Sequence, residues 1–355
     1  MMQWSDILRL QQLGRPVYNE DLGPLDACGK SIENLVFSGV TWRGALLRQS
    51  TMSGVTFVDC DLRGADMRGM TLQACSFTRC KLDHSCWAGV NATQVALTGC
   101  DLSHSDWQGS ALALCAFNQC DLQAITLATS HWQRTVVAQS PLAGASLAHL
   151  VLDQCVLTDI DFRGITVDGL RASASVLRKA CFDGMDLRTV TLSRCLLEEA
   201  SFADANLEGV DLRQANCRQA TLSRTQLRGA DVSGALMLDS VLEDVDATAM
   251  VCEGTILQSA TLRRVCLDHA RATGSVWDHA QLTDVAFTHA DLSYARFDHA
   301  SGGAIDLDHA NLAHSSWHNS QFSDLDMRGA KRTRMRGTSL ARLAAEARSL
   351  SLETR

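Results

Sequence analysis

The sequence contains few residues that interrupt extended backbone and no long apolar run. Only 3 of its 355 residues are proline, so nearly every backbone N–H is available for pairing between strands. Nowhere do 18 consecutive apolar residues occur, and the N-terminus has no charged segment followed by an apolar one and a cleavage site. These absences predict a soluble cytoplasmic protein without a membrane span, and export by a non-classical bacterial system stays open as an alternative.

Motifs that carry chemistry are also missing. The chain has no phosphate-binding glycine loop, no H-E-x-x-H and no C-x-x-C pair. A catalytic site requires polar groups that converge on a concave pocket. We therefore expect no enzyme activity, no catalytic residues and no cofactor.

Apolar residues instead recur at every fifth position. From Leu22 to Met327, all 62 positions ending in 2 or 7 are apolar, with Gly302 the only one that is not a hydrophobe. All ten phenylalanines and six of the seven tryptophans lie on these positions. A helical period of 3.6 or a strand period of 2 would scatter them, so the repeat unit is five residues long.

A second inward position lies two residues before each large one. It holds small or aliphatic residues such as Ala65 and Cys75, and from Leu35 onward none is charged. Asp or Asn often stands between the two positions, where its side chain can accept backbone N–H bonds of its own turn. The unit is therefore small residue, Asp or Asn, large apolar residue, and two polar residues.

This pattern resembles the pentapeptide repeat family, whose consensus A(D/N)LXX is matched by residues 290–294 (ADLSY) and 310–314 (ANLAH). The resemblance covers about nine-tenths of the chain, and its strength comes from many repeats in one frame. It implies an all-β fold: a right-handed, quadrilateral parallel β-helix (a solenoid) with one repeat on each side.

Residues also recur at a spacing of 20, which independently supports four repeats per coil. Phe37, Phe57 and Phe77 share one predicted column, and a second column contains Cys60, Cys80, Cys100 and Cys120. We expect about 15 coils, which at the spacing of paired strands would measure about 70 Å.

The 14 cysteines are interpreted as core residues. Eight occupy the small inward position, and Cys217 and Cys252 occupy the large one. A buried cysteine packs as a small hydrophobe, and many unpaired thiols fit a reducing cytosol. A disulfide or a structural metal held by these residues is the alternative.

The frame divides the chain into three predicted regions. Residues 1–20 form an N-terminal cap with a short helix from Ser5, its N-cap, to Gly14; residues 21–330 form the β-helix; residues 331–355 contain a basic segment and a C-terminal helix through about residue 350. Open ends of a β-helix expose strand edges and core side chains. The helices therefore either cap the coils or bind a partner, through these candidate residues: Trp4, Ile7, Leu8, Leu13, Leu340, Leu343, Ala347 and Leu350.

Histidines gather near the C-terminal end of the repeats. With 20 residues per coil, His269, His289 and His309 form one column, and His279 and His299 form a second column on the opposite face. One interpretation is a solvated set of residues left by duplication. The alternative is that the imidazoles, with neighbouring carboxylates, bind a transition metal or respond to pH.

The predicted solenoid favours a non-catalytic module that binds protein partners. The family resemblance implies a bacterial scaffold or accessory protein, which could be associated with a secretion system. It also suggests a homodimer formed through the C-terminal helix, because a C-terminal element makes a dimer in several family members.

The charge distribution leaves two further hypotheses open. The net charge is -8, and residues 331–355 carry seven Lys or Arg against two Glu. The acidic repeats resemble the gyrase-binding branch of the family, whose members mimic DNA, although the many Lys and Arg residues among them weaken the field. The basic segment could instead contact nucleic acid or acidic lipid.

Overall fold

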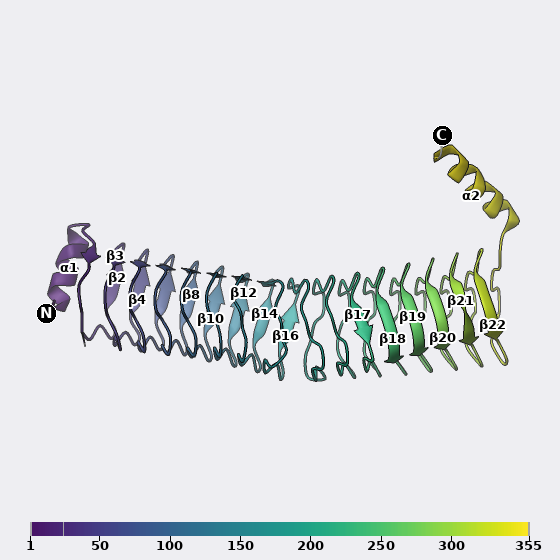
Figure 1. The fold of residues 1–355 in the computed structure, drawn as a ribbon, viewed down its shortest axis with the longest axis horizontal. Helices are drawn as coiled ribbons and strands as arrows, with labels where there is room; N and C mark the ends of the chain where they lie inside the picture. Colours follow the sequence, from purple (N-terminus) through teal and green to yellow (C-terminus); the bar gives the residue numbers. More distant parts are fainter. Residues whose placement is uncertain (1, 24, 354–355) are drawn as a thin grey trace. The chain divides into compact units, whose positions relative to one another are not determined.

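The structure is a computed structural model that describes residues 2–23 and 25–353, with side chains up to Ala347. The chain divides into two compact units, Met1–Ala180 and Cys181–Arg355, and each is described by itself. Both units are built from stacked turns of a parallel β-solenoid, about 15 turns in all (Figure 1). The predicted all-β fold class is therefore confirmed.

The first unit contains two parallel sheets of eight strands on two sides of the solenoid. Neighbouring strands of one sheet come from successive coils. One sheet comprises β1 (Val17–Tyr18), β3 (Val36–Ser38), β5 (Thr56–Val58), β7 (Ser76–Thr78), β9 (Ala96–Thr98), β11 (Ala116–Asn118), β13 (Val136–Ala138) and β15 (Val156–Leu157). The other comprises β2 (Ser31–Glu33), β4 (Thr51–Ser53), β6 (Thr71–Gln73), β8 (Asn91–Thr93), β10 (Ala111–Ala113), β12 (His131–Gln133), β14 (Val151–Asp153) and β16 (Arg171–Ser173).

The second unit contains one parallel sheet of six strands, most of which continue around a corner. Its strands are β17 (Thr221–Ser223), β18 (Val241–Asp246), β19 (Thr261–Cys266), β20 (Gln281–Ala286), β21 (Ser301–Asp306) and β22 (Gln321–Asp326). Strand β22 is the last in the order, and among the described strands it pairs only with β21.

The strand register confirms the predicted coil of 20 residues. Phe37 lies opposite Phe57, which lies opposite Phe77. The remaining sides are linked by single parallel bridges at the same spacing, for example Asp61 with Lys81. Each coil therefore has four sides of five residues.

Polar side chains and left-handed backbone form the corners. The side chains of Asp101 and Asn206 accept the N–H of the residue two positions later, at 3.0 and 3.1 Å, as predicted for the Asp/Asn position. Two residues after the large apolar side chain the backbone has a positive φ, for example 57° at His104. Glycine is common there because it adopts this conformation without strain.

The interior is filled by the five-residue frame. Every residue at the large inward position from Leu22 to Trp317 is buried except Gly302. Aromatic rings stack in columns: Phe57 lies 4.8 Å from both Phe37 and Phe77. The predicted columns are therefore real contacts, each ring packing against the ring in the next coil.

The cysteines at inward positions act as core residues. The thiol of Cys60 donates to the carbonyl oxygen of Phe37 at 3.4 Å, and Cys75 bonds in the same way to Met52 at 3.4 Å. Burial raises the pKa of Cys217 and Cys252 to about 12. All 14 cysteines lie in the described part of the chain, where none is in a disulfide.

The N-terminal helix differs in detail from the prediction. Helix α1 spans Trp4–Gln12, and its N-cap is Gln3, whose N–H donates to the Asp6 carboxylate at 2.8 Å. Ser5 is inside the helix, so the predicted N-cap was wrong, because Asp6 supplies the carboxylate that caps the helix. The helix buries Ile7 and contacts β2.

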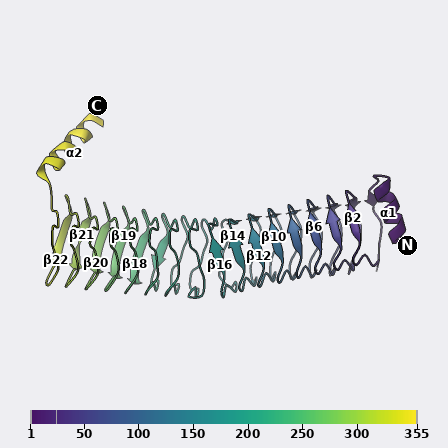
Figure 2. The same ribbon diagram turned by 180° about the vertical axis from the view of Figure 1, so that it is seen from behind.

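The C-terminal helix is present, but it does not cover the last coil. Backbone pairing continues past Ala330 to Arg336, and helix α2 (Leu340–Glu353) then turns back alongside the last coils (Figures 1 and 2). Polar contacts hold α2 to the side of the coils, and its role as a cap or as a partner-binding element stays a prediction. In the described residues, no helix has the length and apolar character to cross a membrane.

At Gly302 the backbone lies unusually close to the backbone of Leu282 in the preceding coil. The φ of Gly302 is 145°, and a Cβ at this position would overlap the carbonyl oxygen of Leu282. The space that a large side chain would fill has therefore been closed by the backbone.

Replacing Phe57 by alanine should leave a cavity between Phe37 and Phe77. We expect the free energy of unfolding to fall by about 3 to 5 kcal/mol, measured by denaturant titration. Phe322→Ala is the matched control, because Phe322 is half-buried in the last coil. Equal losses for the two variants would contradict a continuously stacked interior.

Gly302→Ala should destabilise the second unit by about 3 kcal/mol or more, because the added methyl group meets backbone that cannot easily move. Gly274→Ala is its control, since Gly274 also has a positive φ but no atom lies within 4 Å of the added Cβ. In Gly274→Ala the free energy of unfolding should fall by only about 1 kcal/mol, because alanine is strained at a positive φ. Thermal unfolding of both variants tests the difference, and similar melting temperatures would refute the backbone contact.

Candidate functional site

The candidate site lies where α2 meets one corner of the second unit. Successive coils place residues 20 apart above one another, so Asp298 and His318 lie in one column and His299 and Asn319 in the next. Helix α2 brings Arg342 and Glu346, one turn apart, against these columns. The site therefore combines two coils and a helix.

A buried carboxylate fixes the first turn of α2. The Asp298 side chain is only 4% exposed, and Arg342 Nη1 donates to its Oδ2 at 2.6 Å. Its Oδ1 accepts from the Ser316 hydroxyl and the His318 N–H. Burial would raise the pKa of Asp298, but the hydrogen bonds from Ser316 and Arg342 outweigh it and hold the pKa below its usual range. Asp298 is thus charged at neutral pH and satisfied on both oxygens.

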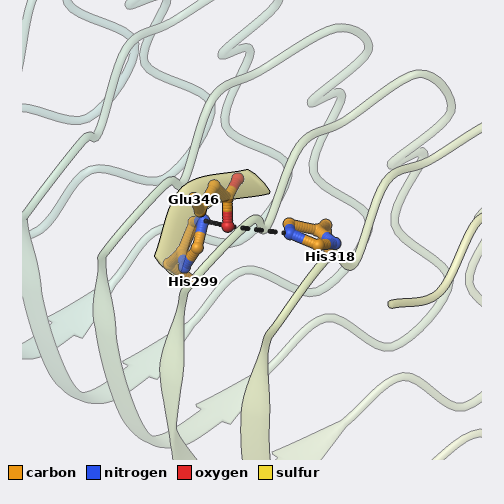
Figure 3. Close-up of side chains that lie close together, drawn as sticks. All are labelled: His299, His318 and Glu346. Atoms are coloured by element: carbon orange, nitrogen blue, oxygen red, sulfur yellow. Dashed lines mark hydrogen bonds and ion pairs between the residues drawn. The ribbon is translucent and has the colours of Figure 1, made fainter. Parts of the chain in front are cut away.

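Two imidazoles converge on one carboxylate oxygen (Figure 3). Glu346 Oε2 lies 3.1 Å from His318 Nε2 and 3.5 Å from His299 Nε2. The three ligand atoms are all within 4.8 Å of one another. The hydrogen bond from His318, followed by that from Arg342, holds the pKa of Glu346 below its usual range. Two imidazole nitrogens and a carboxylate oxygen are common ligands of Zn²⁺.

The second nitrogen of each ring determines where its proton lies. His318 Nδ1 accepts the Ser339 N–H at 3.1 Å, so a neutral His318 carries its proton on Nε2 and donates it to Glu346. His299 Nδ1 lies 3.0 Å from Asn319 Nδ2, and the amide of Asn319 could present either its nitrogen or its oxygen. Hydrogen bonds of the two imidazoles therefore connect α2 and the residue before it to the coils.

The predicted histidine columns are present in the second unit. His269 and His289 stack at 5.2 Å, His289 and His309 lie 5.0 Å apart, and His279 stacks on His299 at 4.8 Å. Nitrogen lone pairs lie in the plane of each ring, so parallel rings point them side by side rather than at one ion. Of the five predicted metal candidates, only His299 belongs to the convergent cluster.

Sequence reasoning missed the other members of this cluster. His318 breaks the Asp-His-Ala pattern, since it stands one position earlier in its repeat than His299, and this shift was the available signal. Arg342 and Glu346 are four apart, as expected for a helical ion pair. Nothing in the spacing shows that this pair would face Asp298 and His318.

The predicted capping and partner-binding residues lie in different environments. Trp4 is half-buried, whereas Leu8 and Leu13 are 36% and 58% exposed. In α2, Leu340 is 79% exposed, Leu343 is half-buried and Ala347 is exposed. The side chain of Leu350 lies outside the described residues. Leu343 and Ala347 line a groove of about 540 Å³ beside Glu346.

The end of the solenoid after β22 exposes core positions. Leu325 is 36% exposed, and Phe322 and Met327 are half-buried, whereas Leu282, Ile305 and Leu307 at the same positions of earlier coils are buried. The repeats that follow Leu325 carry exposed basic residues: Arg328, which pairs with Asp326 at 2.8 Å, and Lys331, Arg332, Arg334 and Arg336. Because Lys331 and Arg336 pair with the preceding coil, this predicted basic segment is a patch on the last coil rather than a tail.

Acidic side chains on the coil surfaces are widely paired with arginine. Arg63 binds Asp61 at 2.7 Å, and Arg213 binds Asp211 at 2.7 Å, each two residues away. Such pairs make the electrostatic potential at the coil surfaces less negative than the number of acidic residues alone would suggest.

The comparisons with known proteins agree with this architecture. A family model described as pentapeptide repeats matches eight copies over residues 33–69, 75–110, 155–194, 200–237 and 266–301, together more than half of the chain. No curated protein shows a significant match.

Two solved structures of similar proteins are a cyanobacterial protein and a plasmid-mediated resistance protein. HetL, a pentapeptide repeat protein involved in heterocyst differentiation regulation from the cyanobacterium Nostoc sp. strain PCC 7120, is 24% identical, with 59% of this chain and 88% of that chain covered and a TM-score of 0.30. QnrB1, a plasmid-mediated fluoroquinolone resistance protein, is 20% identical, with 55% and 92% covered and a TM-score of 0.26. Neither likeness bears on function.

Asp298→Asn should loosen α2, because it removes the charge that binds Arg342 while keeping the side-chain volume. A hydrogen bond to a charged group contributes about 1.5 to 3 kcal/mol, so amide hydrogen exchange in residues 340–347 should accelerate by about tenfold or more. Asp278→Asn is the matched control, since Asp278 lies one coil earlier in the same column and pairs with Arg296. If both variants leave α2 equally protected, Asp298 does not anchor the helix.

Proposed function

Because the chain belongs to the pentapeptide repeat family, we propose that it is a non-catalytic scaffold that binds a protein chain through the C-terminal end of its solenoid. The observation that carries this proposal is the uncovered edge of β22, which contains Phe322 and Leu325 and is followed by Met327. An unpaired edge strand next to exposed core residues is a template for another chain.

The filled interior supports the non-catalytic part of the proposal. The inward positions hold buried Leu, Phe, Trp, Ala and Cys side chains, together with buried serines and threonines such as Ser50, whose hydroxyl donates to the Leu47 carbonyl oxygen at 2.7 Å. From Leu35 to Ala330 no inward position carries a charged side chain. Reacting groups would have to converge on the outer surface, where water competes for charged groups. The buried thiols further support a reducing compartment such as the cytoplasm.

The partner that this end fits best is a second copy of the chain, because two β22 edges related by a twofold axis can satisfy each other's N–H and C=O groups. This interface differs from a dimer made by α2, whose Arg342 and Glu346 are engaged with the coils. The basic patch of Arg328, Lys331, Arg332, Arg334 and Arg336 would be repelled by its own copy. Added salt should therefore strengthen the contact by screening.

Two other partners have weaker support. A DNA mimic that binds gyrase would need a strong acidic field, and pairs such as Arg63–Asp61 and Arg213–Asp211 reduce it. The basic patch could contact nucleic acid or acidic lipid, in which case added salt should weaken binding. The sign of the salt dependence thus separates these contacts from self-association.

Sedimentation velocity of the full chain tests the proposal. We expect concentration-dependent dimers that are more abundant at higher salt, and Leu325→Lys should shift the protein to monomer because it places a charge in the interface. Leu236→Lys is the matched control: Leu236 is 37% exposed, against 36% for Leu325, but lies on the side of an inner coil. A monomer at all concentrations, or equal effects of the two substitutions, would refute end-to-end association.

A further inference from the structure

We propose that His299, His318 and Glu346 form a binding site for a divalent transition metal ion such as Zn²⁺, which fastens α2 to the last coils. The side chains come from two successive coils and from the helix, and Figure 3 shows both rings directed at the carboxylate. Their ligand atoms lie within 4.8 Å of one another. An ion would replace the shared Glu346 oxygen as the point on which both imidazoles converge.

The surrounding groups suit this role. Arg342 Nε donates to Glu346 Oε1 at 2.8 Å, which leaves Oε2 facing the two rings. Asp298 accepts the His318 N–H and so positions the residue's backbone. Asn319, whose Nδ2 lies 3.0 Å from His299 Nδ1, can turn its amide oxygen toward that nitrogen and accept a hydrogen bond from the Nδ1–H. Outer groups that orient metal ligands in this way contribute strongly to affinity.

Metal binding also requires one specific change. An imidazole that binds an ion through Nε2 carries its proton on Nδ1, and His318 Nδ1 currently accepts the Ser339 N–H. That amide must turn away when the ion binds. Ser339 precedes α2 and is exposed, so water can accept its N–H. Metal binding therefore breaks one hydrogen bond, from the Ser339 N–H to His318 Nδ1, and forms bonds from the ion to three side chains.

The site leaves part of the coordination sphere to solvent. Three protein ligands are one short of the four that tetrahedral Zn²⁺ takes. The groove of about 540 Å³ that His299 and Glu346 share with His279, Asn319 and Leu343 provides room for a water at the remaining position. The ion would therefore be held at the protein surface by three side chains and one exchangeable ligand.

Isothermal titration of the full, reduced chain with ZnCl₂ tests the proposal. We expect one site whose affinity falls at least about tenfold in Glu346→Gln, a substitution that keeps an acceptor for the His318 proton. His289→Ala is the matched control, because His289 belongs to an exposed stacked column, and it should bind as the unmodified chain does. Equal affinity in the Glu346→Gln protein, or an equal loss in His289→Ala, would overturn the proposal.

Two further readouts separate the site from thiols and from misfolding. Co²⁺ bound at this site should show only nitrogen and oxygen ligation in its visible spectrum, and a thiolate charge-transfer band would place the metal on cysteine instead. Hydrogen exchange should show α2 docked in metal-free Glu346→Gln, with added Zn²⁺ slowing exchange in α2 only in the unmodified chain. If Zn²⁺ slows exchange in both proteins, Glu346 is not a ligand.

Discussion

The structure depends on contact between each inward side chain and the one 20 residues away. Phe57 stacks on Phe37 and Phe77 at 4.8 Å, close to the spacing of paired strands. The side-chain columns and the backbone ladder therefore share one repeat. Because the interior is occupied at every coil, the protein can vary only its outer faces and its ends without disturbing the fold.

The two ends meet this constraint differently. At the N-terminus, α1 buries Ile7 and contacts β2, so an apolar side chain extends the core. At the C-terminus, α2 is held by polar side chains that include Asp298 and Glu346, and β22 remains uncovered. The N-terminal helix is therefore held by apolar packing and the C-terminal helix by polar contacts.

Much of the fold could be predicted because it follows from a repeat of five residues that is visible in the sequence. The frame from Leu22 to Trp317 specifies burial, coil length and side-chain columns without reference to distant contacts. The candidate site could not be predicted in the same way. His299 was found through its column, but its partners His318 and Glu346 depend on where α2 docks, which no repeat encodes. The N-cap of α1 was predicted wrongly for a different, local reason: Asp6 accepts the Gln3 N–H and the helix begins at Trp4, one residue before the predicted N-cap Ser5.

Each unit is a continuous stack of filled coils, and in the second unit the edge of the last strand, β22, is open. Hydrogen exchange measured along the whole chain at low protein concentration tests it most directly. We expect slow exchange wherever one coil bonds to the next, as Trp277 N–H does to the Arg296 carbonyl at 2.6 Å, and faster exchange in β22 than in β21. Rapid exchange through the inner coils of either unit would contradict it.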